Sequence, residues 1–178
     1  MGLVVGSSLM LHHALLILRL VKGLDKSTHM KRVITSLLFF CSVTASAQTP
    51  ADSVRSTIRS LFTAMYNGDA QTLKSLFHDS ATLGTVMVGS TGETAYRNEP
   101  IAGFIRQVGQ LQKGAADERA VVEQVMVDGP LAMAWVPYSF HYNGKFSHCG
   151  VNLMQLLRVG GMWKILTITD TRRKSPCG

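Results

Sequence analysis

Beyond residue 48, the apolar positions first recur at helical spacing. Pro50 and Asp52 are typical of a helix start, and Gly68 can adopt the positive φ that ends a helix. The apolar stripe between them consists of Val54, Ile58, Leu61, Phe62 and Met65. A second, short helix follows around Leu73. The pattern therefore predicts a pair of helices at the start of a domain.

A strand is predicted at Ala81–Val88, and Pro100–Val108 predicts a third helix. The apolar period then changes to two. Four strands are predicted, at Arg119–Val127, Leu131–Tyr142, Lys145–Val159 and Met162–Thr171. Two-residue turns join them, and Asn143-Gly144 is the strongest of these signals. The expected fold is one α+β domain: a cone-shaped, curved antiparallel sheet covered on one face by three helices.

The two tight turns, at Asn143-Gly144 and Gly160-Gly161, predict which side chains share a face of this sheet. The concave face is expected to carry Met133, Trp135, His148, Asn152, Met154, Leu156, Ile165, Thr167 and Thr169. The other face is expected to carry Ala134, Val136, Tyr138, Phe140, Val151, Leu153, Leu166 and Ile168. Because that second face is also apolar, we expect it to form the interface of a homodimer. A single β-bulge would exchange the two faces downstream of it.

The length of 178 residues suits one domain, and the net charge of +7 raises nucleic acid as a partner. The basic residues are unevenly distributed, however. From Gln48 onward there are 13 basic and 10 acidic side chains, which leaves a net charge of +3. A nucleic-acid groove needs an extended basic stripe interleaved with aromatic residues, and the sequence has none. We therefore expect no nucleic-acid partner.

Residues Met30–Ala47 have the three parts of a signal peptide. Lys31 and Arg32 supply the positive region, Val33–Val43 the apolar region, and Ala45-Ser46-Ala47 the small residues before a cleavage site. The sequence thus predicts export to the periplasm or the medium, with no membrane attachment after cleavage.

The preceding residues, 1–29, contain a second apolar stretch at Leu3–Val21. This stretch could be a membrane helix of marginal length. We favour a non-native N-terminal extension, because a complete signal peptide already begins with its own methionine at Met30.

Cleavage would leave Cys149 and Cys177 in the mature protein. An oxidising compartment would allow them to pair. Their spacing matches no zinc or redox motif, and we expect two free thiols and no metal site.

Several short motifs resemble a known family. Asn67-Gly68-Asp69 and Leu76-Phe77-His78-Asp79 resemble the opening of nuclear transport factor 2-like domains. His148–Asn152, Trp163–Ile165 and Thr169–Arg173 look like a bacterial subgroup labelled putative lumazine-binding, close to the polyketide-cyclase-like proteins. The resemblance covers about residues 50–174, so the domain is expected at residues 48–174, with a tail at 175–178.

This resemblance implies a cavity between the helices and the curved sheet, and often a dimer. It does not imply one activity, since the superfamily includes isomerases, dehydratases, polyketide cyclases and non-catalytic binders. We carry over neither flavin nor lumazine, and we expect no cofactor.

Enzymes of this fold that abstract a proton beside a carbonyl group resemble one another in using a cavity carboxylate as base. The predicted concave face has no carboxylate, since Asp170 falls on the opposite face. The weak catalytic candidates are His148, His78 and Asp79, with Tyr96 or Tyr138 as a possible hydroxyl partner.

His78 is more simply a histidine at a helix C-terminus, and Arg172-Arg173 a solvated tail. Asn152, a polar residue in mid-strand, needs a partner if it is buried. The predicted ligand-binding cavity is lined by Trp135, His148, Asn152, Met154, Thr167 and Thr169.

The function expected from the sequence is an exported protein that binds a small, partly apolar organic molecule, with no demonstrated catalysis. One alternative is a cofactor-independent lyase or isomerase that uses His148 with Asp79 or a tyrosine. A second alternative is an interaction module whose cavity is filled by its own side chains.

Overall fold

The structure is a computed structural model that describes residues 48–175 and residue 177. The expected signal peptide and the extension before it lie outside these residues. The described helices are α3 (Pro50–Asn67), α4 (Ala70–Leu76) and α5 (Ile101–Val108). The described strands are β1 (Phe77–Val88), β2 (Thr94–Pro100), β3 (Ala116–Ala120), β4 (Gln124–Asp128), β5 (Leu131–Tyr142), β6 (Lys145–Val159) and β7 (Met162–Thr171). None of these three helices combines the length and hydropathy needed to cross a membrane.

The ends of α3 follow the local signals in the sequence. Thr49 forms a capping box with Asp52, in which the threonine hydroxyl oxygen accepts from the Asp52 N–H at 3.1 Å. Gly68 ends the helix with φ of 67°. Asp69 then caps α4 by accepting from the Thr72 N–H at 2.9 Å. The predicted helix pair is confirmed.

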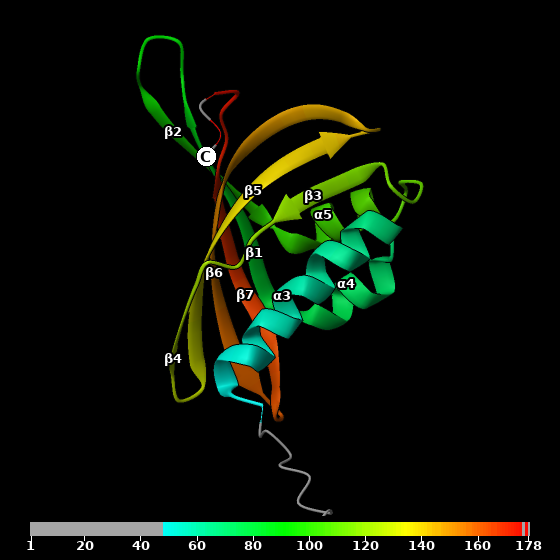
Figure 1. The fold of residues 1–178 in the computed structure, drawn as a ribbon, viewed down its shortest axis with the longest axis vertical. Helices are drawn as coiled ribbons and strands as arrows, with labels where there is room; N and C mark the ends of the chain where they lie inside the picture. Colours follow the sequence, from blue (N-terminus) through cyan, green and yellow to red (C-terminus); the bar gives the residue numbers. More distant parts are fainter. Residues whose placement is uncertain (1–47, 176, 178) are drawn as a thin grey trace, which may run out of the picture. The chain divides into compact units, whose positions relative to one another are not determined.

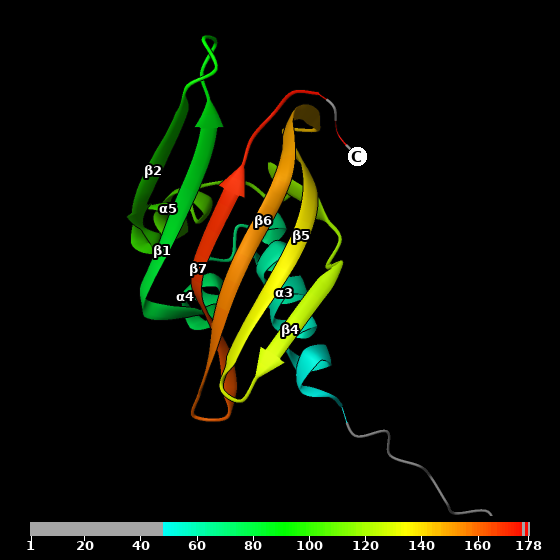
Figure 2. The same cartoon turned by 90° about the vertical axis from the view of Figure 1, so that its left-hand side faces the viewer.

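The sheet has the strand order β2-β1-β7-β6-β5-β3, and β4 also pairs with β5 (Figure 2). β1 and β7 run parallel, whereas the other pairs are antiparallel. The three helices cover one face of the sheet, which curves around them (Figure 1). The predicted α+β fold is therefore confirmed, and its last three strands have the predicted bounds.

Two features of the sheet differ from the expectation. The predicted strand Arg119–Val127 is interrupted and forms β3 and β4. The interruption lies opposite Pro137, which has no N–H to donate to a neighbouring strand. Strand β2 was not predicted, because all its residues are exposed and it shows no apolar alternation.

Two β-bulges determine which side chains face the helices. Between β5 and β6, Phe140 pairs with His148 and His141 pairs with Phe146, so Ser147 is an extra residue. Between β6 and β7, Gln155 pairs with Thr167 and Leu156 with Ile165, which makes Leu166 extra. Each bulge shifts the pairing by one residue, and a shift of one residue moves side chains to the opposite face.

The predicted division of faces is therefore wrong for much of β5 and β7. Ala132, Ala134 and Val136 are buried in the core beneath the helices, although two of them were expected on the outer face. Trp135 lies opposite Leu153 on the outer face and is 42% exposed. The core that results packs α3, α4 and α5 against the inner face of β5, β6 and β7.

The end of the chain is attached to the sheet beside β6. Arg173 and Cys149 exchange two backbone hydrogen bonds of 2.9 Å, and a disulfide joins Cys149 to Cys177, whose Cα atoms are 5.8 Å apart. The expectation of two free thiols was wrong, because the return of the chain along β7 brings residues far apart in the sequence together. Arg172 and Arg173 are both exposed, as expected of a solvated segment. They do not form a free tail, because Arg172 is paired with Asp170 and the backbone of Arg173 is paired with that of Cys149.

Candidate functional site

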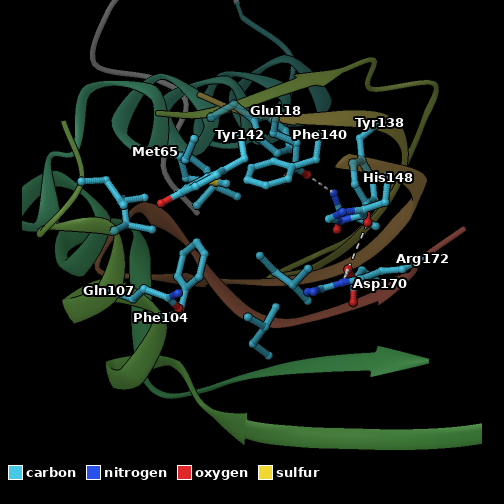
Figure 3. A pocket seen from close by; sticks show the side chains of 18 of the residues that line it. Met65, Phe104, Gln107, Glu118, Tyr138, Phe140, Tyr142, His148, Asp170 and Arg172 are labelled. Atoms are coloured by element: carbon cyan, nitrogen blue, oxygen red, sulfur yellow. Dashed lines mark hydrogen bonds and ion pairs between the residues drawn. The ribbon is translucent and has the colours of Figure 1, made fainter. Parts of the chain in front are cut away.

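A cavity of about 320 Å³ lies between the helices and the inner face of the sheet (Figure 3). Its apolar walls come from both layers, and this volume is at the small end of the range for small-molecule sites. The apolar and aromatic lining residues are Leu61, Phe62, Met65, Leu83, Phe104, Val108, Leu111, Ala116, Phe140, Met154 and Ile168. The polar lining residues are Glu99, Gln107, Glu118, Tyr138, Tyr142, His148, Asn152, Asp170 and Arg172. Six of these polar residues lie on β3, β5, β6 and β7, and Arg172 follows β7; together these seven form a polar end of the cavity. Glu99 from β2 and Gln107 from α5 add polar groups elsewhere on the wall.

Glu118 on β3 is the carboxyl group at this polar end that forms no ion pair among the described residues. The positive charge of Arg172 acts on it from a longer distance and favours its ionised form, but more weakly than burial opposes that form. The Asn152 side-chain amide donates to the Glu118 Oε1 at 2.7 Å. Burial among the cavity walls raises the pKa of Glu118 to about 7, and the nearby negative charge of Asp170 contributes to the rise. The hydrogen bond from Asn152 acts in the opposite direction but is weaker than the effect of burial. Glu118 can therefore gain or lose a proton near neutral pH.

Asp170 on β7 is buried and held by two donors. The Arg172 guanidinium and the Tyr138 hydroxyl donate to its Oδ2 at 2.7 Å and 3.0 Å. Its Oδ1 has no hydrogen-bond partner among the described residues. Burial, followed by the negative charges of Asp170 and Glu118, raises the pKa of Tyr138, so this hydroxyl stays protonated and acts as a donor.

His148 on β6 contacts two aromatic rings of β5. Its ring centroid is 5.7 Å from that of Tyr138 and 5.2 Å from that of Phe140. Its Nδ1 lies 3.0 Å from the Ser147 hydroxyl oxygen. Burial, and then the positive charge of Arg172, lowers the pKa of His148, so the imidazole is mainly neutral at pH 7.

Three of the six residues predicted to line the cavity do so: His148, Asn152 and Met154. The other three do not. The Ser147 bulge turns Trp135 to the outer face, and the Leu166 bulge pairs Thr167 and Thr169 with the outer-face residues Gln155 and Leu153. Asn152 was expected to need a partner, and it finds one in Glu118.

Three of the other catalytic candidates, His78, Asp79 and Tyr96, do not border the cavity. His78 and Asp79 lie at the start of β1 and do not border the cavity, and the His78 Nδ1 accepts from the Ser80 N–H at 3.2 Å. Tyr96 is 60% exposed on β2, whereas Tyr138 lines the cavity. The pairing of His148 with Asp79 is therefore not supported by the geometry.

The most important error concerns the carboxyl groups. The sequence predicted no carboxylate in the cavity, yet Glu118 and Asp170 both border it. Asp170 pairs with Asn152 across the sheet, because the Leu166 bulge moves it to the inner face. The sequence of β5 does not distinguish the two faces. Leu131, Met133 and Trp135 on the outer side are larger apolar residues than Ala132 and Ala134 on the inner side, so apolarity alone gives no signal.

Among residues 48–175 and 177, no three His, Cys, Asp or Glu side chains are grouped closely enough to hold a metal ion.

Similarity to known proteins agrees with the geometry. A family model described as "Putative lumazine-binding" matches residues 49–169. No curated protein is similar enough in sequence to count as a relative.

Solved structures show the same fold. A nuclear transport factor 2-like protein of unknown function from Shewanella baltica is 15% identical, with a TM-score of 0.53, over 69% of this chain and 93% of its own. A nuclear transport factor 2-like protein of unknown function from Silicibacter pomeroyi is 20% identical, with a TM-score of 0.52. The match covers 68% of this chain and 93% of that protein. A domain of unknown function with a cystatin-like fold from Nostoc punctiforme is 20% identical, with a TM-score of 0.54. The match covers 71% of this chain and 80% of that domain. The resemblance seen in the sequence motifs is confirmed at the level of the superfamily.

The raised pKa of Glu118 predicts how stability depends on pH. The pKa is about 7 in the folded protein and about 4.5 in an unfolded chain, so unfolding releases a proton between these values. The free energy of unfolding should therefore fall as the pH rises from 4.5 to 7, and then level off. Glu118→Gln keeps an oxygen acceptor for Asn152 and removes the ionisation. We expect it to stabilise the protein by about 1–3 kcal/mol at pH 8 and to have little effect at pH 4.

Urea unfolding at both pH values measures this difference. Glu123→Gln, an equivalent change at an exposed residue outside the cavity, is the control and should show no such dependence. Equal effects of Glu118→Gln at pH 4 and pH 8 would show that Glu118 titrates as an ordinary carboxyl group.

Proposed function

This chain belongs to the family described as putative lumazine-binding, and we propose that it is an exported protein that binds a small, partly apolar organic molecule in its cavity. The observation that carries the proposal is the cavity itself, about 320 Å³ of space with apolar walls and a polar end. Because this space is not filled by side chains, the alternative of an interaction module with a filled cavity loses its basis.

The arrangement of the walls indicates how such a molecule would bind. The apolar part of the ligand would lie against α3 and α5, where Phe62, Met65 and Phe104 border the cavity. Its polar group would reach the end formed by Glu118, Asn152 and the residues around them. Burial of the apolar part supplies affinity, and the few polar groups supply orientation.

Closing the cavity should abolish binding. Gln107 is an exposed residue of α5 that borders the cavity, and Figure 3 shows it beside Phe104. We expect Gln107→Trp to place an indole ring in the cavity and to weaken ligand binding at least ten-fold. Arg106→Trp, at the neighbouring exposed position that does not border the cavity, is the matched control.

Native mass spectrometry of protein purified from its own host provides the ligand for this test. A small molecule that co-purifies with the parent protein and with Arg106→Trp, but not with Gln107→Trp, supports the cavity as the binding site. Equal retention by both variants would place the ligand elsewhere.

A cofactor-independent lyase or isomerase is the second candidate, and one observation favours it. Glu118 has a pKa near 7 and borders an apolar cavity, as a general base that operates at neutral pH should. Its carboxylate would take a proton from the carbon next to a carbonyl group and return it to another position. The tyrosine hydroxyl of Tyr138 and the amide of Asn152 are the neighbouring hydrogen-bond donors.

Deuterium exchange tests this candidate without knowledge of the substrate. The protein should accelerate exchange of the protons next to the carbonyl group of 2-tetralone in D₂O, measured by proton NMR. Glu118→Gln should remove the acceleration, and Glu123→Gln should keep it. Exchange at the rate of the buffer alone with the parent protein would reject general-base catalysis on this type of compound.

Export remains a proposal that rests on the sequence of Met30–Ala47. The disulfide between Cys149 and Cys177 supports it, since disulfides persist in oxidising compartments. N-terminal sequencing of material from the periplasm or the medium should read Gln48 first. Recovery of the protein only from the cytoplasm, with residues 30–47 intact, would contradict export.

A homodimer through the outer face of the sheet is also proposed, with residues that differ from those first expected. Met126 and Met133 are paired across β4 and β5, and Trp135 lies two residues further along β5. Their side chains are 64%, 40% and 42% exposed. Such a group of large apolar side chains on one sheet face favours a protein partner.

Trp135→Glu should therefore convert a dimer to a monomer in size-exclusion chromatography with light scattering. Val88→Glu, at a position 68% exposed at the end of β1, is the control and should stay dimeric. A parent protein that is monomeric at micromolar concentration would contradict this proposal.

A further inference from the structure

The charges around the cavity do not balance. The ionisable residues that border it, apart from tyrosines, are Glu99, Glu118, His148, Asp170 and Arg172. Arg172 and Asp170 form an ion pair with an Nε–Oδ2 distance of 2.7 Å and so neutralise each other. His148 is mainly neutral at pH 7, because burial and the charge of Arg172 lower its pKa. The two groups that form no ion pair among the described residues are the carboxyl groups of Glu118 and Glu99. Arg172 also attracts Glu118, but its closest contact is with Asp170.

Glu118 is the deeper of these two groups. Its hydrogen-bond partner is the Asn152 amide, a neutral donor to Oε1, and its other oxygen accepts no hydrogen bond from a described residue. Glu99, by contrast, lies on the exposed strand β2 at the edge of the cavity. A carboxylate among apolar walls is unfavourable unless a positive charge or further donors accompany it. A positive charge beside Glu118 would therefore stabilise its ionised form, which the more distant Arg172 does only in part.

Aromatic rings border the same space. Phe62 on α3, Phe104 on α5 and Phe140 on β5 line the cavity, together with the ring of Tyr142. Figure 3 shows Phe140 and Tyr142 on the same side of the cavity as Glu118, with Phe104 across from them. The faces of aromatic rings attract organic cations, most strongly where water is excluded. Rings around one unpaired carboxyl group form a site suited to a protonated nitrogen that carries an apolar substituent.

We propose that the cavity ligand binds as a cation, an organic amine or basic heterocycle whose N–H donates to the carboxylate of Glu118 while its apolar part contacts the surrounding rings. This inference rests on the proposed binding function and adds the chemical class of the ligand. The basic group of the cavity does not favour the opposite charge, because Arg172 already donates to Asp170. An anionic ligand would meet Glu118 and Glu99 without a free cation among the described lining residues.

Three probes of equal size separate the possibilities: 2-naphthylmethylamine, 2-naphthylmethanol and 2-naphthoate. They share one apolar part and differ in charge. Isothermal titration calorimetry at pH 7.5 should show that the amine binds about ten-fold or more tightly than the alcohol, and that the naphthoate binds most weakly. Glu118→Gln should reduce the ratio of amine to alcohol affinity to about one. Glu123→Gln, exposed and outside the cavity, should leave the ratio unchanged.

Proton release gives a second readout that needs no variant. The polar groups that border the cavity together with Glu118 are Asn152 and His148 from β6, Tyr138 and Tyr142 from β5, Asp170 and Arg172 at the end of β7, Glu99 from β2 and Gln107 from α5. Because Glu118 is partly protonated at pH 7, a bound ammonium group should displace part of its proton into the buffer. The buffer takes up the released protons, and phosphate and Tris have different protonation enthalpies. The binding enthalpy of the amine should therefore differ between the two buffers in proportion to the number of protons released. The binding enthalpy of the alcohol should be the same in both buffers.

The three affinities and the proton release distinguish a failure of the cationic-ligand proposal from a failure of the binding function itself. Alcohol binding as tight as amine binding, or tightest binding by the naphthoate, would overturn the cation and leave a binding cavity. Amine binding without proton release at pH 7 would also overturn it. If none of the three probes binds, the proposed binding function fails as well.

Discussion

The pairing of β5 with β6 is the constraint on which the candidate site depends. Ser147 is one residue more than a regular hairpin would hold, and this extra residue sets the face of every side chain on β5 before Phe140. Val136 and Tyr138 turn inward as a result, and Trp135 turns outward. The second bulge, at Leu166, does the same for Asp170. Two extra residues therefore decide whether the cavity has a polar end.

This geometry has an energetic consequence. Turning Tyr138, Asn152 and Asp170 inward places polar groups in a layer whose other members are aliphatic, such as Val136 and Met154. Most of these groups satisfy one another through hydrogen bonds. Glu118 accepts a hydrogen bond from Asn152, but this bond does not compensate for its burial. Its pKa is raised because ionising the buried carboxyl group costs free energy. A protein that retains such a group gives up stability at neutral pH, which is typical of functional sites.

The fold was predictable because its signals are local. The capping box at Thr49, the glycine at Gly68 and the turn at Asn143-Gly144 each determine a helix end or a hairpin from a few adjacent residues. The fold class followed from the order of these elements. The bounds of β5, β6 and β7 followed from the turns between them.

The candidate site was only partly predictable, because its composition depends on long-range register. His148, Asn152 and Met154 all border the cavity, because they share a strand and alternate regularly. Glu118 was missed because it lies on β3, the first half of an interrupted strand. β3 and β4 each pair with β5, and nothing in the sequence indicates the register of this pairing. Neither bulge residue, Ser147 or Leu166, is a glycine or another residue that marks a bulge. The disulfide was missed because it depends on where the chain end lies in space.

Glu118 borders the cavity and forms no ion pair with a described residue, so burial dominates its protonation. Carbon-13 NMR of the side-chain carboxyl group, in protein labelled at glutamate, measures this directly as a titration curve. The expected midpoint for Glu118 is about 7. A midpoint near the ordinary glutamate value of about 4.3 would show that the carboxyl group is hydrated outside the cavity, and would contradict the account.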